Sequence, residues 1–346
     1  MFKKLMNSYY FGKAGKSDLT PEDLPETRWQ LFLETFRTHF SMLFRLNLMY
    51  VVVWIPALIV LFMGLSAGVN QLMLVDIGDG TSIQTQMAQE ERLEAEASGN
   101  TETAVQQAQP VLTMAEVSNN LRSVLLFSLL LMVPFITITG PATSGICYIT
   151  RNWSRDEHAF MWSDFKDAVK ANWKQSIVIS FITSLLPLLV YLSWTFYGGL
   201  IAEGQAFMVV PQMLVVLVGV IWAISVTYMH PLIVSYELKL RDVIRNGLLM
   251  GVARLPFSIG IRLLHMVPTA IAAVMFVFWN PPYGMLFFFL WYVLFGFACS
   301  RFITASYTNA VFDRFINSRI EGAVVNRGLR EQDPDEDDED DEETES

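Results

Sequence analysis

Six blocks of apolar residues set the limits on what this chain can fold into. Each block is about twenty residues long, which is the length of helix that crosses the ~30 Å hydrocarbon core of a bilayer. The chain is 53% hydrophobic and only 17% charged, a composition that excludes an ordinary soluble domain. The pattern predicts an all-α fold, a polytopic transmembrane helical bundle of about six spans. The blocks cover approximately 46–66, 122–147, 176–197, 208–230, 259–279 and 285–305.

The basic residues predict how these spans are oriented. Lys and Arg gather in every second segment between the blocks, which by the positive-inside rule marks those segments as cytoplasmic. We therefore expect a cell-membrane protein with both termini in the cytoplasm. The segments carry seven Lys and Arg in 1–45, one in 67–119, five in 148–175, none in 198–207, four in 231–258, none in 280–284 and five in 301–330.

The formal net charge of −10 comes from one end of the chain. Eleven of the last fourteen residues, Asp333 to Ser346, are acidic, and the rest of the sequence carries 24 Lys and Arg against 23 Asp and Glu. Because like charges repel one another, we expect this tail to be disordered. No basic stripe interleaved with aromatics indicates a nucleic-acid partner.

Three parts of the chain follow from these patterns. Residues 1–45 form a cytoplasmic N-terminal segment, 46–306 a six-span membrane domain, and 307–346 a cytoplasmic segment with the acidic tail. The external loop 67–119 is rich in Gln, Glu, Ala and Thr, and within it Met87 to Ala97 has the composition of a short helix.

Amphipathic segments precede or separate the spans on the cytoplasmic side. Between Arg28 and Phe44, aromatic and aliphatic residues recur at spacings of three and four, which predicts a helix lying in the inner interface. A second such helix is expected after Ser163 as its N-cap, with Phe165 and Trp173 on its apolar line. These helices predict anionic headgroups of the inner leaflet as lipid partners.

A third amphipathic segment repeats the pattern of the second. Residues 240–247 match 165–172 in residue class at nearly every position, 75 residues further on. One interpretation is a parallel repeat of span, interfacial helix and span. The other is convergence, because any basic helix on an inner leaflet has this pattern. Both interpretations stay open.

The second span is the richest in residues that bend or narrow a helix. Pro134 and Pro141 each remove a backbone donor, and neighbouring threonines, Thr143 among them, are available to bond the freed carbonyls. Gly140 begins a surface of small residues suited to close helix approach. One interpretation is a broken helix lining a substrate pathway. The other, which we favour, is a kinked and tightly packed helix.

Ionisable residues within the spans are few. Arg262 and Arg301 lie near inner ends, where arginine side chains reach the headgroups. His265 lies deeper in the fifth span, and an intramembrane ionisable residue is a functional candidate by default. The candidate functional or packing positions are Gly140, Pro141, Thr143, His265 and Arg262.

The sequence shows no signature of an enzyme. It lacks a His-Glu-x-x-His pair, a phosphate-binding Gly-x-x-x-x-Gly-Lys loop and a Cys-x-x-Cys pair, which mark common metal, nucleotide and redox sites. We therefore expect no catalytic, metal-binding or cofactor-binding residues, and no cofactor.

Some residues of the chain resemble a known family. The run Gly140 to Thr143 followed by Arg151, Asn152 and Trp153, together with Leu46 to Leu48, resembles the YesL-like family of bacterial integral membrane proteins. The resemblance covers residues 28–65 and 122–255. It implies no established activity, and it suggests an accessory role beside carbohydrate uptake systems. Where such proteins have little sequence between the two motifs, this chain has about ninety residues.

Two functions follow from the sequence. The first is an accessory or regulatory component of a transport or signalling system, which would have other membrane proteins such as transporter subunits as partners. The alternative is a secondary carrier or channel, suggested by the second span and His265.

Overall fold

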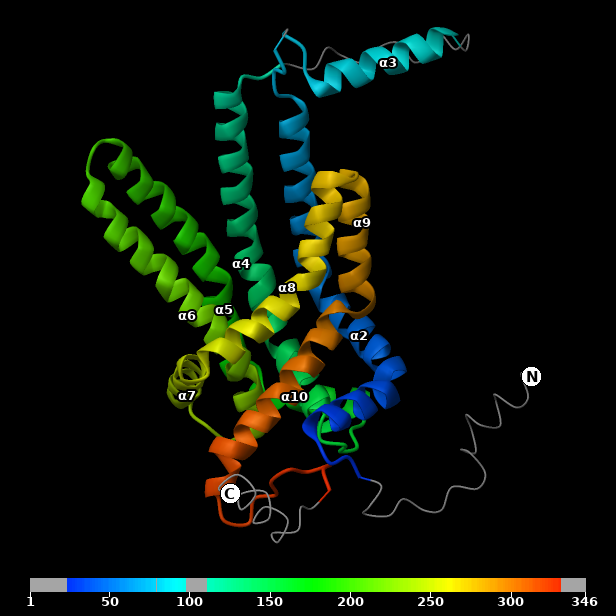
Figure 1. Ribbon diagram of the computed structural model, residues 1–346, viewed down its shortest axis with the longest axis vertical. Helices are drawn as coiled ribbons and strands as arrows, with labels where there is room; N and C mark the ends of the chain where they lie inside the picture. The colour runs from blue at the N-terminus through cyan, green and yellow to red at the C-terminus, as the bar shows by residue number, and fades with distance from the viewer. Residues whose placement is uncertain (1–23, 79, 98–110, 331–346) are drawn as a thin grey trace, which may run out of the picture. The chain divides into compact units, whose positions relative to one another are not determined.

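The computed structural model describes residues 24–78, 80–97 and 111–330, and this part of the chain is helical almost throughout (Figure 1). Turns and short segments connect successive helices. The helices are α2 (Arg28–Met73), α3 (Ile83–Ala97), α4 (Met114–Trp153), α5 (Met161–Ala202), α6 (Val209–Ser235), α7 (Leu240–Ala253), α8 (Leu255–Phe278), α9 (Pro281–Trp291) and α10 (Phe297–Phe315), with the π-helical η4 (Tyr292–Gly296) and the 3₁₀ turns η3 (Ala206–Met208) and η5 (Asn317–Arg319).

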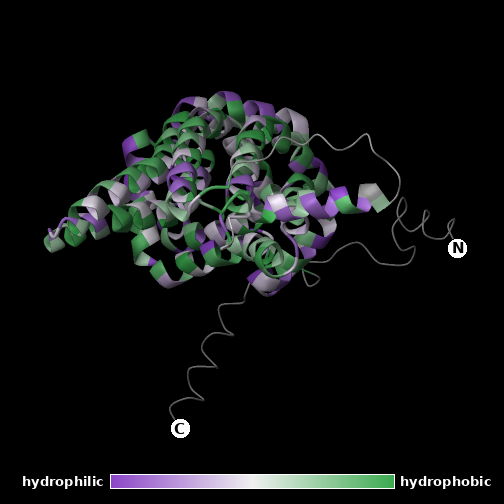
Figure 2. Cartoon of the chain, turned by 90° about the horizontal axis from the view of Figure 1, so that it is seen from above, coloured by the Kyte–Doolittle hydropathy of each residue, from purple (hydrophilic) through white to green (hydrophobic). Residues whose placement is uncertain are grey.

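Six helical stretches of the described chain are long and apolar enough to cross a membrane. Each holds one of the six apolar blocks, so the predicted all-α fold with about six spans is confirmed. Figure 2 shows hydrophobic residues along much of the helical part of the chain, with hydrophilic residues scattered among them. The stretches are Arg28–Met73, Met114–Trp153, Met161–Ala202, Ala206–Ser235, Leu255–Phe278 and Pro281–Arg319.

The described chain forms two compact units. Unit 1 contains residues 24–48, 145–168 and 265–330, and unit 2 contains Met49–Ser144 and Val169–Leu264. Helices α2, α4, α5 and α8 each contribute residues to both units. The predicted division at residues 45 and 306 stays a prediction, and the acidic tail lies outside the described residues.

Two of the expected interfacial helices are the first turns of longer helices. The segment from Arg28 to Phe44 is helical as predicted, and it continues into the span as part of α2 because no Pro or Gly interrupts it before Pro56. The predicted N-cap at Ser163 is wrong. Helix α5 begins at Met161, three residues before the start that an N-cap at Ser163 implies, and Asp164 Oδ2 accepts a hydrogen bond from the Phe160 backbone N–H at 2.9 Å and so caps this helix.

The third interfacial helix, α7, is a separate element that packs on α6 within unit 2. Gly247 and Gly251 lie one turn apart on its buried face. A β-carbon on Gly251 would lie 3.1 Å from the Cα atom of Ser225, and one on Gly247 would lie 2.7 Å from Met229 Cγ. The two glycines therefore allow the close backbone approach that small residues give membrane helices. This contact distinguishes 240–247 from its sequence counterpart 165–172.

In unit 2, backbone hydrogen bonds join the two ends of the segment between α2 and α4, which the sequence predicts to be external. The Asp76 N–H donates to the Leu112 carbonyl and the Leu112 N–H donates to the Leu74 carbonyl, both at 2.9 Å. Helix α3 covers the predicted segment Met87 to Ala97 but begins earlier, at Ile83. The cause is a reciprocal cap: Ser82 N–H donates to Thr85 Oγ1 at 2.7 Å, and Thr85 N–H donates to Ser82 Oγ at 3.2 Å.

In unit 1 the last span contains a π-helical segment that one side chain completes. The fully buried Asn47 amide donates to the carbonyls of Tyr292 and Val293 at 3.0 and 2.8 Å, and its Oδ1 accepts from the Ala298 N–H at 2.8 Å. A π turn leaves backbone groups without their α-helical partners. Asn47 satisfies three of them where the bilayer offers no water.

We predict that Asn47→Leu destabilises the protein strongly. The substitution removes three hydrogen bonds to buried backbone groups of the last span, and a buried group that loses its partner costs about 1–3 kcal/mol. Thermal unfolding in a mild detergent measures the effect as a lower melting temperature. Asn120→Ala is the control, because Asn120 is exposed and bonds only Gln71; it should change stability by less than about 0.5 kcal/mol. Equal melting temperatures for both variants would contradict the assigned role of Asn47.

Candidate functional site

Gly140, a candidate from the sequence, lies in a tight contact between α4 and α5 in unit 2. A β-carbon there would lie 2.5 Å from the Ser176 carbonyl oxygen and 2.8 Å from Ser180 Oγ. Ser144 Oγ bonds Ser176 Oγ one turn along α4, and Thr137 Oγ1 lies 3.3 Å from Ser184 Oγ in the other direction. Ser176, Ser180 and Ser184 of α5 are all buried. Small hydroxyl side chains therefore fill this interface and bond across it.

Thr143 and Pro141 belong to the same part of α4. The Thr143 hydroxyl bonds the Tyr50 hydroxyl at 2.7 Å, and both side chains are buried. Pro141 is half-buried within the continuous helix. These positions join α2, α4 and α5 inside unit 2. The structure thus supports the packing interpretation of the second span, which remains one helix of 40 residues rather than a broken one.

The expected hydrogen bonds of the threonines in this span are wrong in detail. Prolines 134 and 141 would free the carbonyls four residues before them, at 130 and 137. Instead, the hydroxyls of Thr137, Thr139 and Thr143 donate to the carbonyls of residues 133, 136 and 139. Each hydroxyl follows the local geometry of a Thr side chain, which reaches its own preceding turn.

We predict that Gly140→Ala lowers stability by about 1–3 kcal/mol, the usual cost of overpacking a core. The new methyl group meets backbone atoms of Ser176, which cannot rotate away. Gly260→Ala in α8 is the matched control, because a β-carbon there meets no atom within 4 Å; it should be neutral or stabilising. Thermal unfolding of both variants tests this, and an unchanged melting temperature for Gly140→Ala would exclude the close contact.

The ionisable candidates lie on α8. His265, in unit 1, is half-buried, and its Nε2 atom lies 3.5 Å from Thr304 Oγ1 on α10. This distance is at the upper limit of a hydrogen bond. Arg262, in unit 2, is also half-buried. The five candidates are divided between the units: Gly140, Pro141, Thr143 and Arg262 belong to unit 2 and His265 to unit 1.

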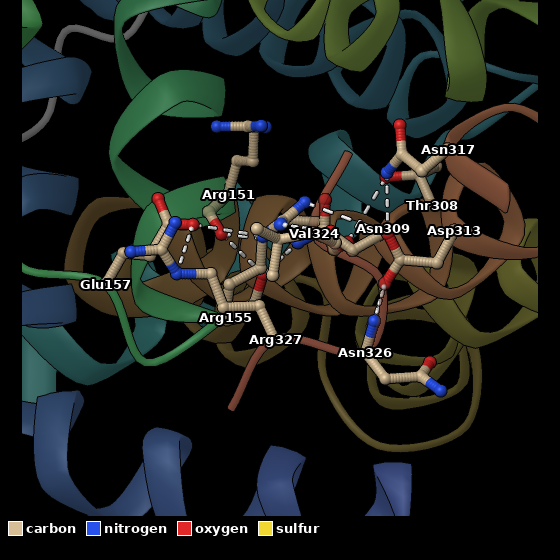
Figure 3. Close-up of polar contacts among 12 residues, drawn as sticks. Arg151, Arg155, Glu157, Thr308, Asn309, Asp313, Asn317, Val324, Asn326 and Arg327 are labelled. Atoms are coloured by element: carbon tan, nitrogen blue, oxygen red, sulfur yellow. Dashed lines mark hydrogen bonds and ion pairs between the residues drawn. The ribbon is translucent and has the colours of Figure 1, made fainter. Parts of the chain in front are cut away.

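Sequence analysis missed a buried cluster of charges in unit 1, built around Asp313 (Figure 3). The Asp313 side chain is 2% exposed. Its Oδ2 atom lies 2.6 Å from the Arg28 guanidinium and accepts the Asn326 backbone N–H at 3.2 Å. Its Oδ1 atom accepts from Asn317 Nδ2 at 2.6 Å, and the Arg155 guanidinium lies 3.8 Å away. A buried carboxylate requires this number of partners.

The cluster extends to the end of α4 through Arg155. Arg155 Nε lies 3.1 Å from Glu157 Oε1, and Arg327 Nε lies 3.2 Å from the same oxygen. The Arg155 guanidinium also donates to the Val324 carbonyl at 3.3 Å. Gly328 has a φ of +84°, and a β-carbon there would lie 3.0 Å from the Arg155 carbonyl oxygen. The segment after α10 thus passes close against the end of α4.

The motif Arg151, Asn152 and Trp153 shapes the turn that holds Arg155 in place. Trp153 is 1% exposed, and its ring stacks on the His39 ring at a centroid distance of 5.0 Å. The Asn152 carbonyl accepts the backbone N–H groups of Arg155 and Glu157 at 3.0 and 2.8 Å. Asn309 of α10 donates to the Arg151 carbonyl at 3.2 Å. The motif therefore ends α4 and binds α10.

Chemically, this cluster is an anchor. Three arginines, Arg28, Arg155 and Arg327, face two carboxylates, Asp313 and Glu157, and both oxygens of Asp313 already have partners. The arrangement ties the first turn of α2, the end of α4 and the segment after α10 to one buried charge. Among the described residues, no group of three His, Cys, Asp or Glu side chains is placed to hold a metal ion.

We predict that Asp313→Asn destabilises unit 1 by about 3 kcal/mol, because it leaves arginines without their buried counter-charge. The loss should also speed tryptic cleavage at Arg319 and Arg327, which are exposed. Glu26→Gln is the control: its pair with Arg330, at 3.4 Å, is exposed on both sides, and such pairs contribute about 0–1 kcal/mol. Equal cleavage rates in the two variants would show that Asp313 does not anchor this segment.

The fold and these contacts define a multi-pass helical membrane protein. Within it, residues 121–194 match a family described as a protein of unknown function, DUF624. The matched segment includes most of α4 and α5, with the small residues of their contact and the turn at Trp153. Comparisons of the chain with curated proteins and with solved structures found no match.

Proposed function

We propose that this protein is an accessory or regulatory component of a transport or signalling system, without catalytic activity of its own. The observation that carries the proposal is how the polar side chains within the spans are used. Asn47 completes the backbone of η4, Thr143 bonds Tyr50, and Tyr228 bonds Ser258 at 2.6 Å. Groups that a carrier would use to bind a polar solute serve here to join helices.

The arrangement of the charged residues supports the same proposal. The buried cluster around Asp313 stabilises a folded surface at the arginine-rich end of unit 1, and α7 forms a further amphipathic element in unit 2. By the positive-inside rule these ends face the cytoplasm, where other proteins and anionic lipids are accessible to them. The partners we propose are subunits of a membrane transporter or sensor.

The resemblance to YesL-like bacterial proteins makes this proposal more specific. The residues that carry the resemblance include Asn47, Gly140 and Trp153, each of which makes a buried contact. Through that resemblance we propose a cell-membrane protein of a bacterium that assists carbohydrate uptake. The role involves no cofactor and no nucleic acid.

Affinity purification tests the accessory role. The full chain, tagged at its C-terminus and expressed at its native level, is solubilised in a mild detergent and captured. We expect transporter or sensor subunits to be recovered in amounts comparable with the tagged chain. Asp313→Asn should reduce this recovery more than Glu26→Gln does, because it loosens the arginine-rich surface of unit 1. Recovery of no stable partner from the wild-type chain would contradict the proposal.

A carrier or channel is the alternative function, and the position of His265 opposite Thr304 is the observation that favours it. Purified protein reconstituted in vesicles, with a panel of sugars as solutes, tests this alternative. Solute flux that His265→Ala abolishes would support a carrier and contradict the accessory role. We expect no flux above that of empty vesicles.

The proposed orientation predicts which exposed residues react from outside the cell. In a chain with Cys147 and Cys299 replaced by Ala, Glu90→Cys in α3 should react with a membrane-impermeant maleimide on intact cells. Glu237→Cys, between α6 and α7, should react only after permeabilisation. Because both residues are exposed, a difference in their labelling before permeabilisation shows on which side of the membrane each one lies. The opposite pattern would reverse the orientation.

A further inference from the structure

A cavity in unit 1 has walls that are almost entirely apolar. Its volume is about 190 Å³. Phe36, Phe40 and Leu43 of α2 form one wall, and the opposite wall comes from the last span of the chain. That opposite wall consists of Trp291, Phe295 and Cys299.

The π-helical segment gives this wall its shape. Asn47 holds η4 in its widened form, and η4 carries Phe295, whose ring stacks on the Phe40 ring at a centroid distance of 5.3 Å. At the end of η4, Gly296 lets the indole of Trp291 lie against the backbone, since a β-carbon there would lie 2.9 Å from Trp291 Cδ1. The cavity is therefore fixed by the same contacts that complete η4.

The size and polarity of the cavity suit a hydrocarbon chain. Apolar protein cavities of about 150 Å³ stay dry and accept small apolar molecules, whereas sites for polar small molecules need several converging polar groups and about 300 Å³ or more. Phe40, one of the lining residues, is 47% exposed. A chain from the surrounding bilayer could therefore enter between α2 and the last span without displacing a buried side chain.

One charge stands beside the cavity. Arg37 is exposed, and within the described part of the chain it forms no ion pair, although Glu34 lies three residues earlier. At 3.6 residues per turn, Arg37 is about 60° around α2 from Phe40, whereas Arg45 is about 140° away, on the other side of the helix. On the surface of α2, Arg37 is therefore closer than Arg45 to the cavity-lining residues Phe36 and Phe40.

We propose that this cavity holds part of an acyl chain of an anionic phospholipid, whose phosphate lies against Arg37. The arginine supplies the attraction for the negative headgroup, and the aromatic walls supply the fit for the chain. The site would give unit 1 a preference for anionic over zwitterionic lipid. The proposal requires that unit 1 lies in the membrane and does not depend on the accessory role.

Native mass spectrometry of the full chain in a non-ionic detergent tests the proposal. Phosphatidylglycerol and phosphatidylcholine with identical acyl chains are the two probes. We expect retained phosphatidylglycerol on the wild-type protein and a loss of about fivefold in its affinity for Arg37→Gln, the effect of one basic residue near a charged surface. Arg45→Gln is the matched control and should retain the lipid. Cys299→Phe, which fills the cavity, should lose it too.

A second measurement does not depend on a variant that might misfold. Cys299 lines the cavity and is the probe, whereas Cys147 is buried and serves as the reference. The alkylation of each thiol in the wild-type chain is followed by peptide mapping. Phosphatidylglycerol should slow the alkylation of Cys299, and phosphatidylcholine should slow it less. Equal protection of Cys299 by both lipids would overturn the proposal, and so would equal phosphatidylglycerol affinity of Arg37→Gln and Arg45→Gln. Protection of Cys299 by dimer formation without lipid would overturn it too.

Discussion

Inside a bilayer the backbone must satisfy its own hydrogen bonds, because the hydrocarbon core contains no water to replace them. The described chain meets this requirement with long continuous helices and, at η4, with one side chain. There the backbone departs from the α-helical pattern, and the buried Asn47 amide takes the place of the missing partners at Tyr292, Val293 and Ala298. Asn47 stabilises the π-helical form of η4, and Phe295 of η4 is one of the residues that line the cavity.

The same environment determines how the helices pack. Lipid tails are as apolar as leucine, so membrane helices associate through close backbone approach and hydrogen bonds rather than through hydrophobic burial. Gly140 with Ser176 in one interface and Gly251 with Ser225 in another show this directly. Several polar side chains in the spans bond other helices, as Asn47, Thr143 and Tyr228 do, and others bond the preceding turn of their own helix. That is the physical basis for proposing an accessory role.

Charges follow a different rule and gather where buried groups can be paired. Asp313 is almost fully buried, which is stable only because Arg28, Arg155, Asn317 and the Asn326 backbone surround it. The result joins the first turn of α2 to the segment after α10. Arg37, by contrast, is exposed and forms no ion pair within the described chain.

The sequence by itself determined the positions of the six spans, the helical state of the amphipathic segments and the packing character of Gly140, because hydropathy and small-residue patterns are local properties. It placed the N-cap of α5 at Ser163, three residues late, because the capping carboxylate of Asp164 lies inside the helix. Tertiary structure alone decided that Asn47 bonds residues about 245 positions away and that Arg28 meets Asp313 across 285 positions. No local pattern encodes such pairs, since only the folded chain brings their atoms together.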